Sequence, residues 1–126
     1  MSDVPGELRY TSEHEWARSE DGRIVVGITD YAQDQLGDVV FVGLPDPGTE
    51  VEAGQPLGEV ESTKSVSDIY SPISGKVLAK NSEVEENPEL INDDPYGKGW
   101  LVAIEATRGS VDELLTADAY KKLIEE

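Results

Sequence analysis

The sequence predicts a mainly β fold, a small barrel or sandwich with a few short peripheral helices. Short apolar segments with a period of two recur along the chain, and turns rich in glycine and proline separate them. The length of 126 residues suits one domain with a modest core, so we expect residues 1–126 to form a single domain. Because aromatic residues make up only 6% of the chain, that core is expected to consist of Val, Ile, Leu and Ala.

The first two strands are expected on either side of a tight turn. The segment HEWARS, residues 14–19, is predicted to be the first strand, and the sequence EDG at residues 20–22 predicts the turn. In the returning segment RIVVGIT, the apolar residues Ile24, Val26 and Ile28 alternate with a period of two. This alternation predicts a second strand with one buried face.

The next segment, DYAQDQLG, predicts a helix of two turns. Asp30 and Gln33 have the spacing of a capping box, and Gly37 is a typical C-terminal stop. Ala32 and Leu36 would then lie on the same side of the helix and face the core.

Most of the following chain is predicted to form short strands. Residues 39–45, VVFVGLP, are apolar at successive positions, which predicts a strand covered on both faces. The sequence DPG at residues 46–48 is a turn signal. Further strands are expected at residues 49–51, 56–62, 66–70, 75–81 and 100–106.

Before the last strand, the sequence predicts a short helix that starts at Pro88 and a loop just ahead of it. Asn87 has the character of an N-cap, and Pro88 suits the first position of a short helix. The acidic run at residues 83–86 is expected to be a solvated loop.

The C-terminal segment, residues 110–126, is predicted to be helical. Ser110 and Glu113 have the spacing of a capping box. The apolar residues that recur at helical spacing are Leu114, Leu115, Tyr120, Leu123 and Ile124.

The composition excludes several classes of function. Ten basic residues against 27 acidic ones give a formal net charge of −17, which disfavours binding to nucleic acid or anionic membranes and favours basic partners. No apolar run is long enough to cross a membrane. The chain has no cysteine, and its first ten residues lack the basic and apolar regions of a signal peptide. We therefore expect a cytoplasmic protein without disulfides.

One lysine stands alone in an acidic stretch. Lys64 is the only Lys or Arg between Arg23 and Lys76, an interval that carries nine carboxylates. Val60 and Ile69 are expected to face the core from two strands, and the loop that joins these strands holds Lys64. The lysine would thus lie at or beside the apex of a hairpin, in solvent. The residues alone leave the register of this hairpin open.

Three interpretations of Lys64 are considered. A solvated surface lysine is the ordinary one. A catalytic Schiff-base lysine needs a pKa lowered by apolar burial or by a nearby cation, whereas Glu61 and Asp68 stabilise the ammonium form. The third interpretation is a modification target, an exposed lysine that another enzyme finds by shape and acylates. Its neighbours Thr63 and Ser65 are small and leave it accessible.

The only histidine, His14, lies between Glu13 and Glu15. A metal site there would need carboxylates to complete it, so we expect a structural role and no metal site. Trp16 and Trp100 are predicted to pack in the core or at its edge, with the indole N–H bonded to backbone.

Five blocks of the chain resemble, in order, blocks of the glycine cleavage system H protein family. They are YTSEHEW (10–16), GITDYAQDQLGDVVFVGLP (27–45), GTEVEAGQPLGEVES (48–62), GEVESTKSVSDIYSPISGKV (58–77) and INDDPYGKGW (91–100). The resemblance implies a barrel-sandwich hybrid of the lipoyl- and biotinyl-carrier kind, with two antiparallel sheets, short peripheral helices and a C-terminal helix. It also implies lipoate as the cofactor, amide-linked to Lys64.

By this resemblance the protein is a carrier and not an enzyme. It would accept an aminomethyl group from glycine decarboxylase (P protein) and deliver it to aminomethyltransferase (T protein). Dihydrolipoamide dehydrogenase (L protein) would then reoxidise the dihydrolipoyl group. A lipoyl-attaching enzyme would have to act first. We also expect a monomer that, given the net charge, binds neither nucleic acid nor membrane.

Two related functions use the same architecture. Biotinyl carriers typically place methionines on both sides of the lysine, and Thr63 and Ser65 differ from that pattern. A lipoate relay, which would supply lipoyl groups to 2-oxoacid dehydrogenase complexes, is compatible with the same residues and stays open.

The resemblance further implies a cleft that shelters the loaded arm near the first strand and the hairpin. An aminomethyl thioether is fragile in water because its nitrogen lone pair can expel the thiol. A neighbouring carboxylate favours the ammonium form, which has no free lone pair. The candidate residues are Glu15, Asp68 and Glu13, the last at a position where relatives often carry a small polar residue.

Overall fold

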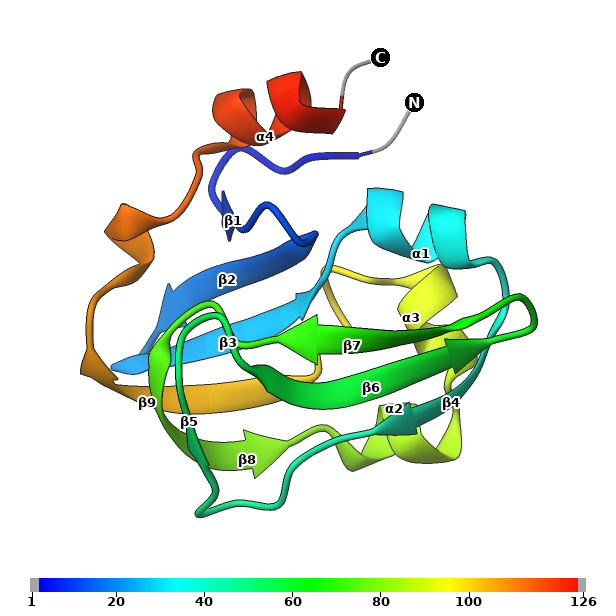
Figure 1. The fold of residues 1–126 in the computed structure, drawn as a ribbon, viewed down its shortest axis with the longest axis horizontal. Helices are drawn as coiled ribbons and strands as arrows, with labels where there is room; N and C mark the ends of the chain where they lie inside the picture. Colours follow the sequence, from blue (N-terminus) through cyan, green and yellow to red (C-terminus); the bar gives the residue numbers. More distant parts are fainter. Residues whose placement is uncertain (1–2, 125–126) are drawn as a thin grey trace.

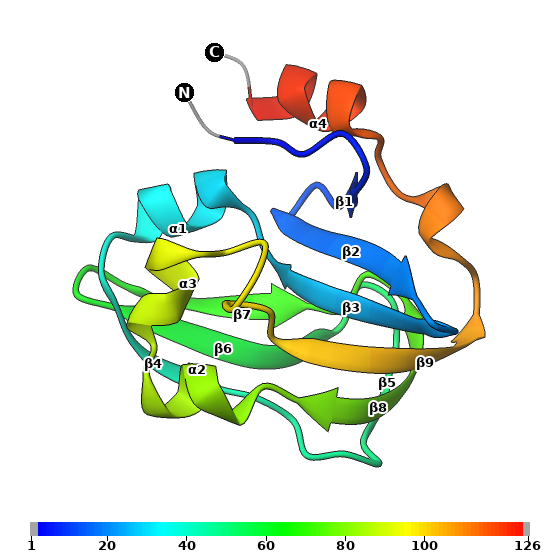
Figure 2. The same ribbon diagram turned by 180° about the vertical axis from the view of Figure 1, so that it is seen from behind.

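Residues 3–124, which the computed structural model describes, contain nine strands in two antiparallel sheets. Figures 1 and 2 show the two sheets packed against each other, with short helices around them. The main core contains Val26 and Ile104 from the larger sheet, and Val60 and Ile69 from the smaller one. Its buried members are all Val, Ile, Leu and Ala, as predicted. The mainly β fold class is confirmed.

The larger sheet has six strands in the order β1-β2-β3-β9-β8-β5. These strands are β1 (Arg9–Tyr10), β2 (Glu15–Glu20), β3 (Arg23–Ile28), β5 (Glu50–Val51), β8 (Ser74–Lys80) and β9 (Val102–Arg108). The two-residue strand β1 was not predicted. The strand predicted at residues 14–19 is β2, and it begins one residue later than predicted, at Glu15. His14 cannot belong to it because its φ of 74° lies outside the extended region.

The smaller sheet has the order β4-β6-β7, and its strands are β4 (Val39–Gly43), β6 (Pro56–Ser62) and β7 (Val66–Tyr70). The predicted bounds of β6 and β7 are confirmed. The prediction that β4 is covered on both faces is wrong, since Val40 and Phe41 are 55% and 46% exposed. The outer face of this sheet is open, and the pairing of β4 with β6 shifts between Val39 and Phe41.

Helix α1 (Asp30–Leu36) follows the prediction except at its cap. The N-cap is Thr29, whose side chain accepts a hydrogen bond from the Ala32 N–H at 3.1 Å. Asp30 lies inside the first turn and accepts from the Gln33 side chain instead. Gly37 ends the helix with a φ of 81°, as predicted. Ala32 and Leu36 both pack against the main core.

The prediction of a loop at residues 83–86 is wrong, because α2 (Ser82–Glu86) occupies them. The side chain of Asn81 caps this helix by accepting from the Glu83 N–H, and Val84 is fully buried. Helix α3 (Glu89–Asp93) follows.

The predicted cap of α3 is also wrong. Pro88 is the N-cap residue and makes no side-chain capping bond, and Asn87 ends α2. In the described part of the chain no helix is long and apolar enough to cross a membrane.

The C-terminal segment is helical in two separate pieces, not continuously. A 3₁₀ turn, η1 (Val111–Glu113), and helix α4 (Ala117–Ile124) are separated by extended backbone. The N–H and C=O of Leu115 each bond to the backbone of Tyr10 in β1, which interrupts the helix. Residues 125 and 126 of the predicted helical segment lie outside the described residues.

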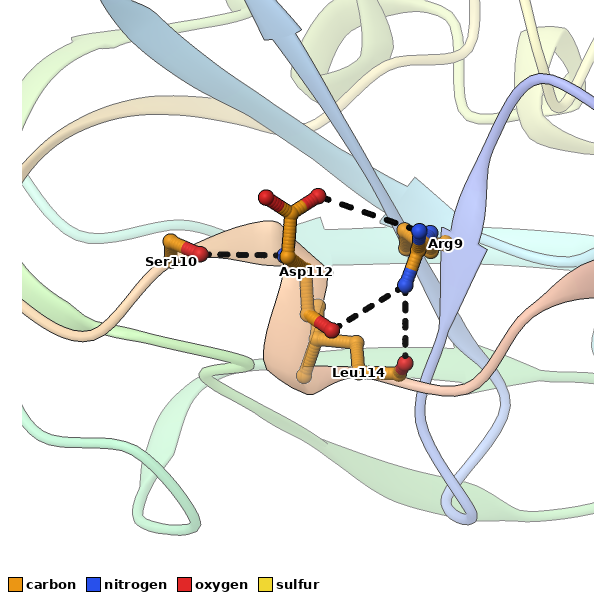
Figure 3. A network of polar contacts seen from close by, with 4 residues as sticks. All are labelled: Arg9, Ser110, Asp112 and Leu114. Atoms are coloured by element: carbon orange, nitrogen blue, oxygen red, sulfur yellow. Dashed lines mark hydrogen bonds and ion pairs between the residues drawn. The ribbon is translucent and has the colours of Figure 1, made fainter.

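Arg9 fastens this segment to the larger sheet (Figure 3). Its Nη1 donates to the carbonyls of Asp112 and Leu114 at 3.1 and 3.4 Å. The Asp112 N–H donates in turn to the hydroxyl of Ser110, which caps η1. The ion pair between Arg9 and the Asp112 carboxylate is long, 3.8 Å, so the carbonyl contacts are the stronger restraint.

A second, aromatic cluster joins α4 to strands β1 and β2, and it was not predicted. The rings of Tyr10 and Tyr120 stack with their centroids 4.8 Å apart, and Trp16 is buried beside them. The Trp16 indole N–H donates to the carbonyl of Pro95 at 2.9 Å, which confirms the predicted backbone partner. Trp100 packs at the edge of the same cluster.

Candidate functional site

The tip of the β6–β7 hairpin presents Lys64 to solvent. The paired part of the hairpin ends at Glu61 and Val66, which settles the register that the sequence left open. The Ser62 N–H donates to the carbonyl of Ser65 at 2.8 Å. The Ser62 hydroxyl accepts from the N–H groups of Lys64 and Ser65, each at 3.1 Å. This small serine turn holds the tip in shape and leaves the lysine exposed.

The tip is attached to the connection between α1 and β4, beside which it lies in both views of the fold (Figures 1 and 2). The Thr63 N–H donates to the carbonyl of Asp38 at 3.1 Å. The Nζ of Lys64 donates to the carbonyl of Gln35, near the end of α1, at 3.4 Å. The lysine therefore extends from the hairpin towards the helix.

A pocket of about 380 Å³ lies next to this lysine, between α1, β7 and the residues that precede β2. All three predicted acids, Glu13, Glu15 and Asp68, line it. The remaining lining residues are mostly apolar or neutral polar groups: His14, Ile28, Tyr31, Ala32, Gln35, Leu36, Val60, Ser65, Ser67 and Ile69. The pocket thus combines hydrocarbon walls with carboxyl groups.

Glu15 is the buried acid of this pocket, with only 2% of its surface exposed. Its Oε1 accepts from the Thr11 hydroxyl at 2.6 Å, and its Oε2 accepts from the Tyr70 N–H at 3.2 Å. Burial raises the pKa of Glu15 to about 7, although both hydrogen bonds favour the ionised form. Glu13 raises that pKa slightly further. The carboxyl group therefore changes its charge close to neutral pH.

Glu13 and Asp68 are exposed, and their carboxyl groups lie at the rim of the pocket. The Glu13 N–H donates to the Thr11 hydroxyl oxygen at 3.2 Å, so one threonine contacts two of the three acids. Asp68 lies on β7, opposite Glu59.

His14 forms part of the pocket wall and is held from behind. Its Nδ1 lies 2.8 Å from the hydroxyl of Tyr120, which lies 2.7 Å from the hydroxyl of Thr29. Burial lowers the pKa of His14, which favours the neutral ring. These contacts support the structural role predicted for His14.

Sequence reasoning did not anticipate Thr11, Tyr70 or the capping role of Ser62. The serine stands three residues before Ser65, a spacing typical of a side-chain turn, and this signal was available. Thr11 and Tyr70 gave no such signal. Thr11 meets Glu15 through the local turn between β1 and β2, whereas Tyr70 meets it only when the two sheets pack.

A model of the family described as Glycine cleavage H-protein matches residues 8–126. The chain belongs to this family. Among curated H proteins, it is 51% identical over 127 residues to the one from Halalkalibacterium halodurans, covering 100% of this chain and 99% of that relative. It is 55% identical over 131 residues to the one from Mycolicibacterium smegmatis, covering 100% of both chains.

The fold comparison agrees with this membership. The crystal structure of a glycine cleavage system H protein from Mycobacterium marinum superimposes with a TM-score of 0.88 at 45% identity. The match covers 94% of this chain and 97% of the other. In this H-protein fold, the hairpin lysine, the neighbouring pocket and the three acids therefore form the candidate functional site.

Proposed function

We propose that the protein is the lipoyl-bearing shuttle of glycine cleavage, with lipoate amide-linked to Lys64. Membership of the H-protein family supports the pathway. One observation supports the site most strongly: an isolated lysine is exposed at a hairpin tip directly beside a pocket lined by acids. The site suits a carrier more than an enzyme, because the lysine is not desolvated as Schiff-base chemistry requires.

The proposed partners are those that the family implies. They are glycine decarboxylase, aminomethyltransferase, dihydrolipoamide dehydrogenase and a lipoyl-attaching enzyme. The net charge of −17 favours encounter with partners that present basic surfaces. We propose that residues 1–126 act as one carrier domain; the cytoplasmic location and the monomeric state stay predictions.

The residues around Lys64 suit the cofactor. Ile28, Leu36 and Ile69 give the pocket hydrocarbon walls that match the methylene chain of a lipoyl arm. The acids would face the amine of the cargo at the far end of that arm. When attached, lipoate supplies a sulfur atom that carries the aminomethyl group between active sites. Lys64 supplies the tether, and tethering raises the effective concentration of the cargo at a docked partner.

The role of the acids is to keep the amine of the cargo protonated. A cation that enters the pocket favours the ionised form of Glu15 and lowers its pKa below the value of about 7. The carboxylate favours the ammonium form in return. Burial strengthens this interaction because little water screens it. We propose that Glu13 and Asp68 add negative charge at the rim.

Complementation of a host that lacks its H protein tests this function. The parent protein should restore glycine catabolism, and the Lys64→Arg variant should not, because a guanidinium is not acylated by the lipoyl-attaching enzyme. Lipoylation of the host's 2-oxoacid dehydrogenases is measured in the same cells. Restoration of that lipoylation alone would contradict the proposed shuttle and favour a relay.

A further inference from the structure

The side chain of Lys64, although exposed, crosses the backbone at Gly37. A Cβ atom placed on Gly37 would lie 3.0 Å from the Cε of Lys64, 3.8 Å from its Nζ and 4.0 Å from its Cδ. A side chain at position 37 would therefore crowd the lysine stem, which would have to shift by a few tenths of an ångström. Beyond Gly37 its Nζ reaches the carbonyl of Gln35 at 3.4 Å.

Gly37 differs from other glycines of the chain that have similar backbone angles. Its φ of 81° and ψ of −154° are typical of glycine alone. Gly22 and Gly54 have φ values of 80° and 84°, but a Cβ on either would meet nothing within 4 Å. Only the backbone restricts those two positions, whereas Gly37 is restricted by the lysine as well.

The residues around Gly37 are fixed from two sides. Asn92 of α3 donates to the carbonyl of Gly37 and accepts from the N–H of Val39, both at 2.9 Å. The carbonyl of Asp38, between these two contacts, accepts from Thr63 at the hairpin tip. The side chain of one asparagine therefore positions the segment on which the tip rests.

The carbonyl that receives Lys64 is suited to an N–H donor. Gln35 lies in the last turn of α1, where carbonyl groups lack partners within the helix and carry partial negative charge. The ammonium of an unmodified lysine satisfies this carbonyl. An acylated lysine retains one N–H that can donate to the same carbonyl, without the charge that strengthens the contact of the ammonium. Gln35 and Leu36 also line the pocket, so a lysine held here is directed into it.

We propose that residues 37–39 form a seat for the modified lysine, which turns the arm from the hairpin tip into the pocket. Gly37 makes the crossing sterically possible, and Asn92 is a positioning residue that keeps the seat in place. This proposal rests on the proposed function, since the seat serves an arm attached to Lys64. It also assigns a role to Asn92, which belongs to the INDDPYGKGW block. The carrier chemistry itself does not involve this block.

Nuclear Overhauser effects in the parent protein give the most direct test. In the unmodified protein we expect cross-peaks between the Hε protons of Lys64 and the Hα protons of Gly37. In the lipoylated protein we expect cross-peaks from the lysine stem to Gly37, and from the arm to Leu36. Absence of the Gly37 cross-peaks in the lipoylated protein would overturn the seat.

Two variants test the mechanism. Gly37→Ala should abolish the cross-peaks between the arm and Leu36, whereas Gly22→Ala, with a similar φ and free space, should retain them. Asn92→Ala should weaken them without touching the lysine. Because Gly37→Ala carries backbone strain, amide spectra must first show that each variant is folded. If Gly37→Ala does not fold, the cross-peaks of Asn92→Ala and of the parent protein test the seat instead. Retained cross-peaks in a folded Gly37→Ala protein would contradict the proposal.

Failure of the seat and failure of the proposed function give different results. If mass spectrometry finds no lipoyl group on Lys64, the carrier function fails, and the cross-peaks of the unmodified lysine still report on the seat. If Lys64 is lipoylated but its stem makes no contact with Gly37, the seat fails and the carrier function stands.

Discussion

The hydroxyl of Thr11 donates a hydrogen bond of 2.6 Å to the buried carboxyl group of Glu15. Thr11 follows β1 and Glu15 begins β2, so the short connection between these strands shapes the acidic wall of the pocket. The Tyr70 N–H, from the other sheet, binds the second oxygen of the same carboxyl group. Glu15 thus joins the two sheets at the point where the proposed arm would end.

Stability should depend on the titration of Glu15. The pKa of Glu15 rises from its usual 4.5 to about 7 on folding, so the folded state holds more protons than the unfolded state between these values. The contribution of Glu15 to the free energy of unfolding is therefore present below about pH 4.5 and falls as the pH rises to 7. As the pH rises across this window, the free energy of unfolding of Glu15→Gln should increase by on the order of 3 kcal/mol relative to that of the parent.

Urea unfolding of both proteins at pH 4.5 and at pH 7.5 measures this difference. Glu105→Gln, at an exposed position outside the pocket, is the matched control and should follow the parent. An unchanged difference between parent and Glu15→Gln at the two pH values would show that Glu15 titrates normally.

The Thr11 contact should hold the pKa of Glu15 below the value that burial alone would give. The hydroxyl stabilises the ionised carboxyl group, so Thr11→Val, which keeps the shape and removes the donor, should raise the pKa of Glu15 above about 7. Carbon-13 NMR of the Glu15 carboxyl carbon follows the titration directly. A pKa that stays the same or falls in Thr11→Val would refute this assignment of the hydrogen bond.

Lys64→Arg should separate carrier function from stability. Lys64 is exposed at the hairpin tip, and surface substitutions usually change the free energy of unfolding by less than about 0.5 kcal/mol. Glycine cleavage in a reconstituted system should nevertheless be lost completely. Any turnover above background by a folded Lys64→Arg protein would rule out Lys64 as the carrier.

The acids should slow breakdown of the loaded cargo. Once lipoylated and loaded, Glu15→Gln and Asp68→Asn should release formaldehyde and ammonia faster than the parent protein with no partner enzyme present, because the amine loses its proton more readily. The effect should be larger for buried Glu15 than for exposed Asp68. Glu105→Gln again serves as control, and equal release rates in all four proteins would leave both acids without a protective role.

The local structure of the hairpin could be predicted from the sequence, because alternation and turn residues determine it. Predicted strands at 56–62 and 66–70 match β6 and β7. The predicted helix at 110–126 failed where a distant contact intervenes, namely the bridge from Leu115 to Tyr10. Helix α2 was not predicted because residues 83–86 contain three glutamates and one apolar residue, which gives no helical periodicity. That apolar residue, Val84, is nevertheless fully buried.

The candidate site was predictable only in part. Family resemblance indicated Glu13, Glu15 and Asp68, and the structure places all three around one pocket. The burial of Glu15 was not predictable, because its partner Tyr70 is 55 residues away and approaches only through the packing of the sheets. Glu15 was predicted to be a carboxylate of the cleft, but its raised pKa was not predicted, because burial brings that pKa from 4.5 to about 7.

Peptide mass spectrometry of the protein purified from its native host, grown with lipoate available, tests the central claim most directly. The peptide that contains Lys64 should carry the mass of a lipoyl amide on that residue, and peptides that contain the neighbouring lysines, Lys76 and Lys80, should not. Biotin on Lys64, or an unmodified Lys64 under these conditions, would contradict the account.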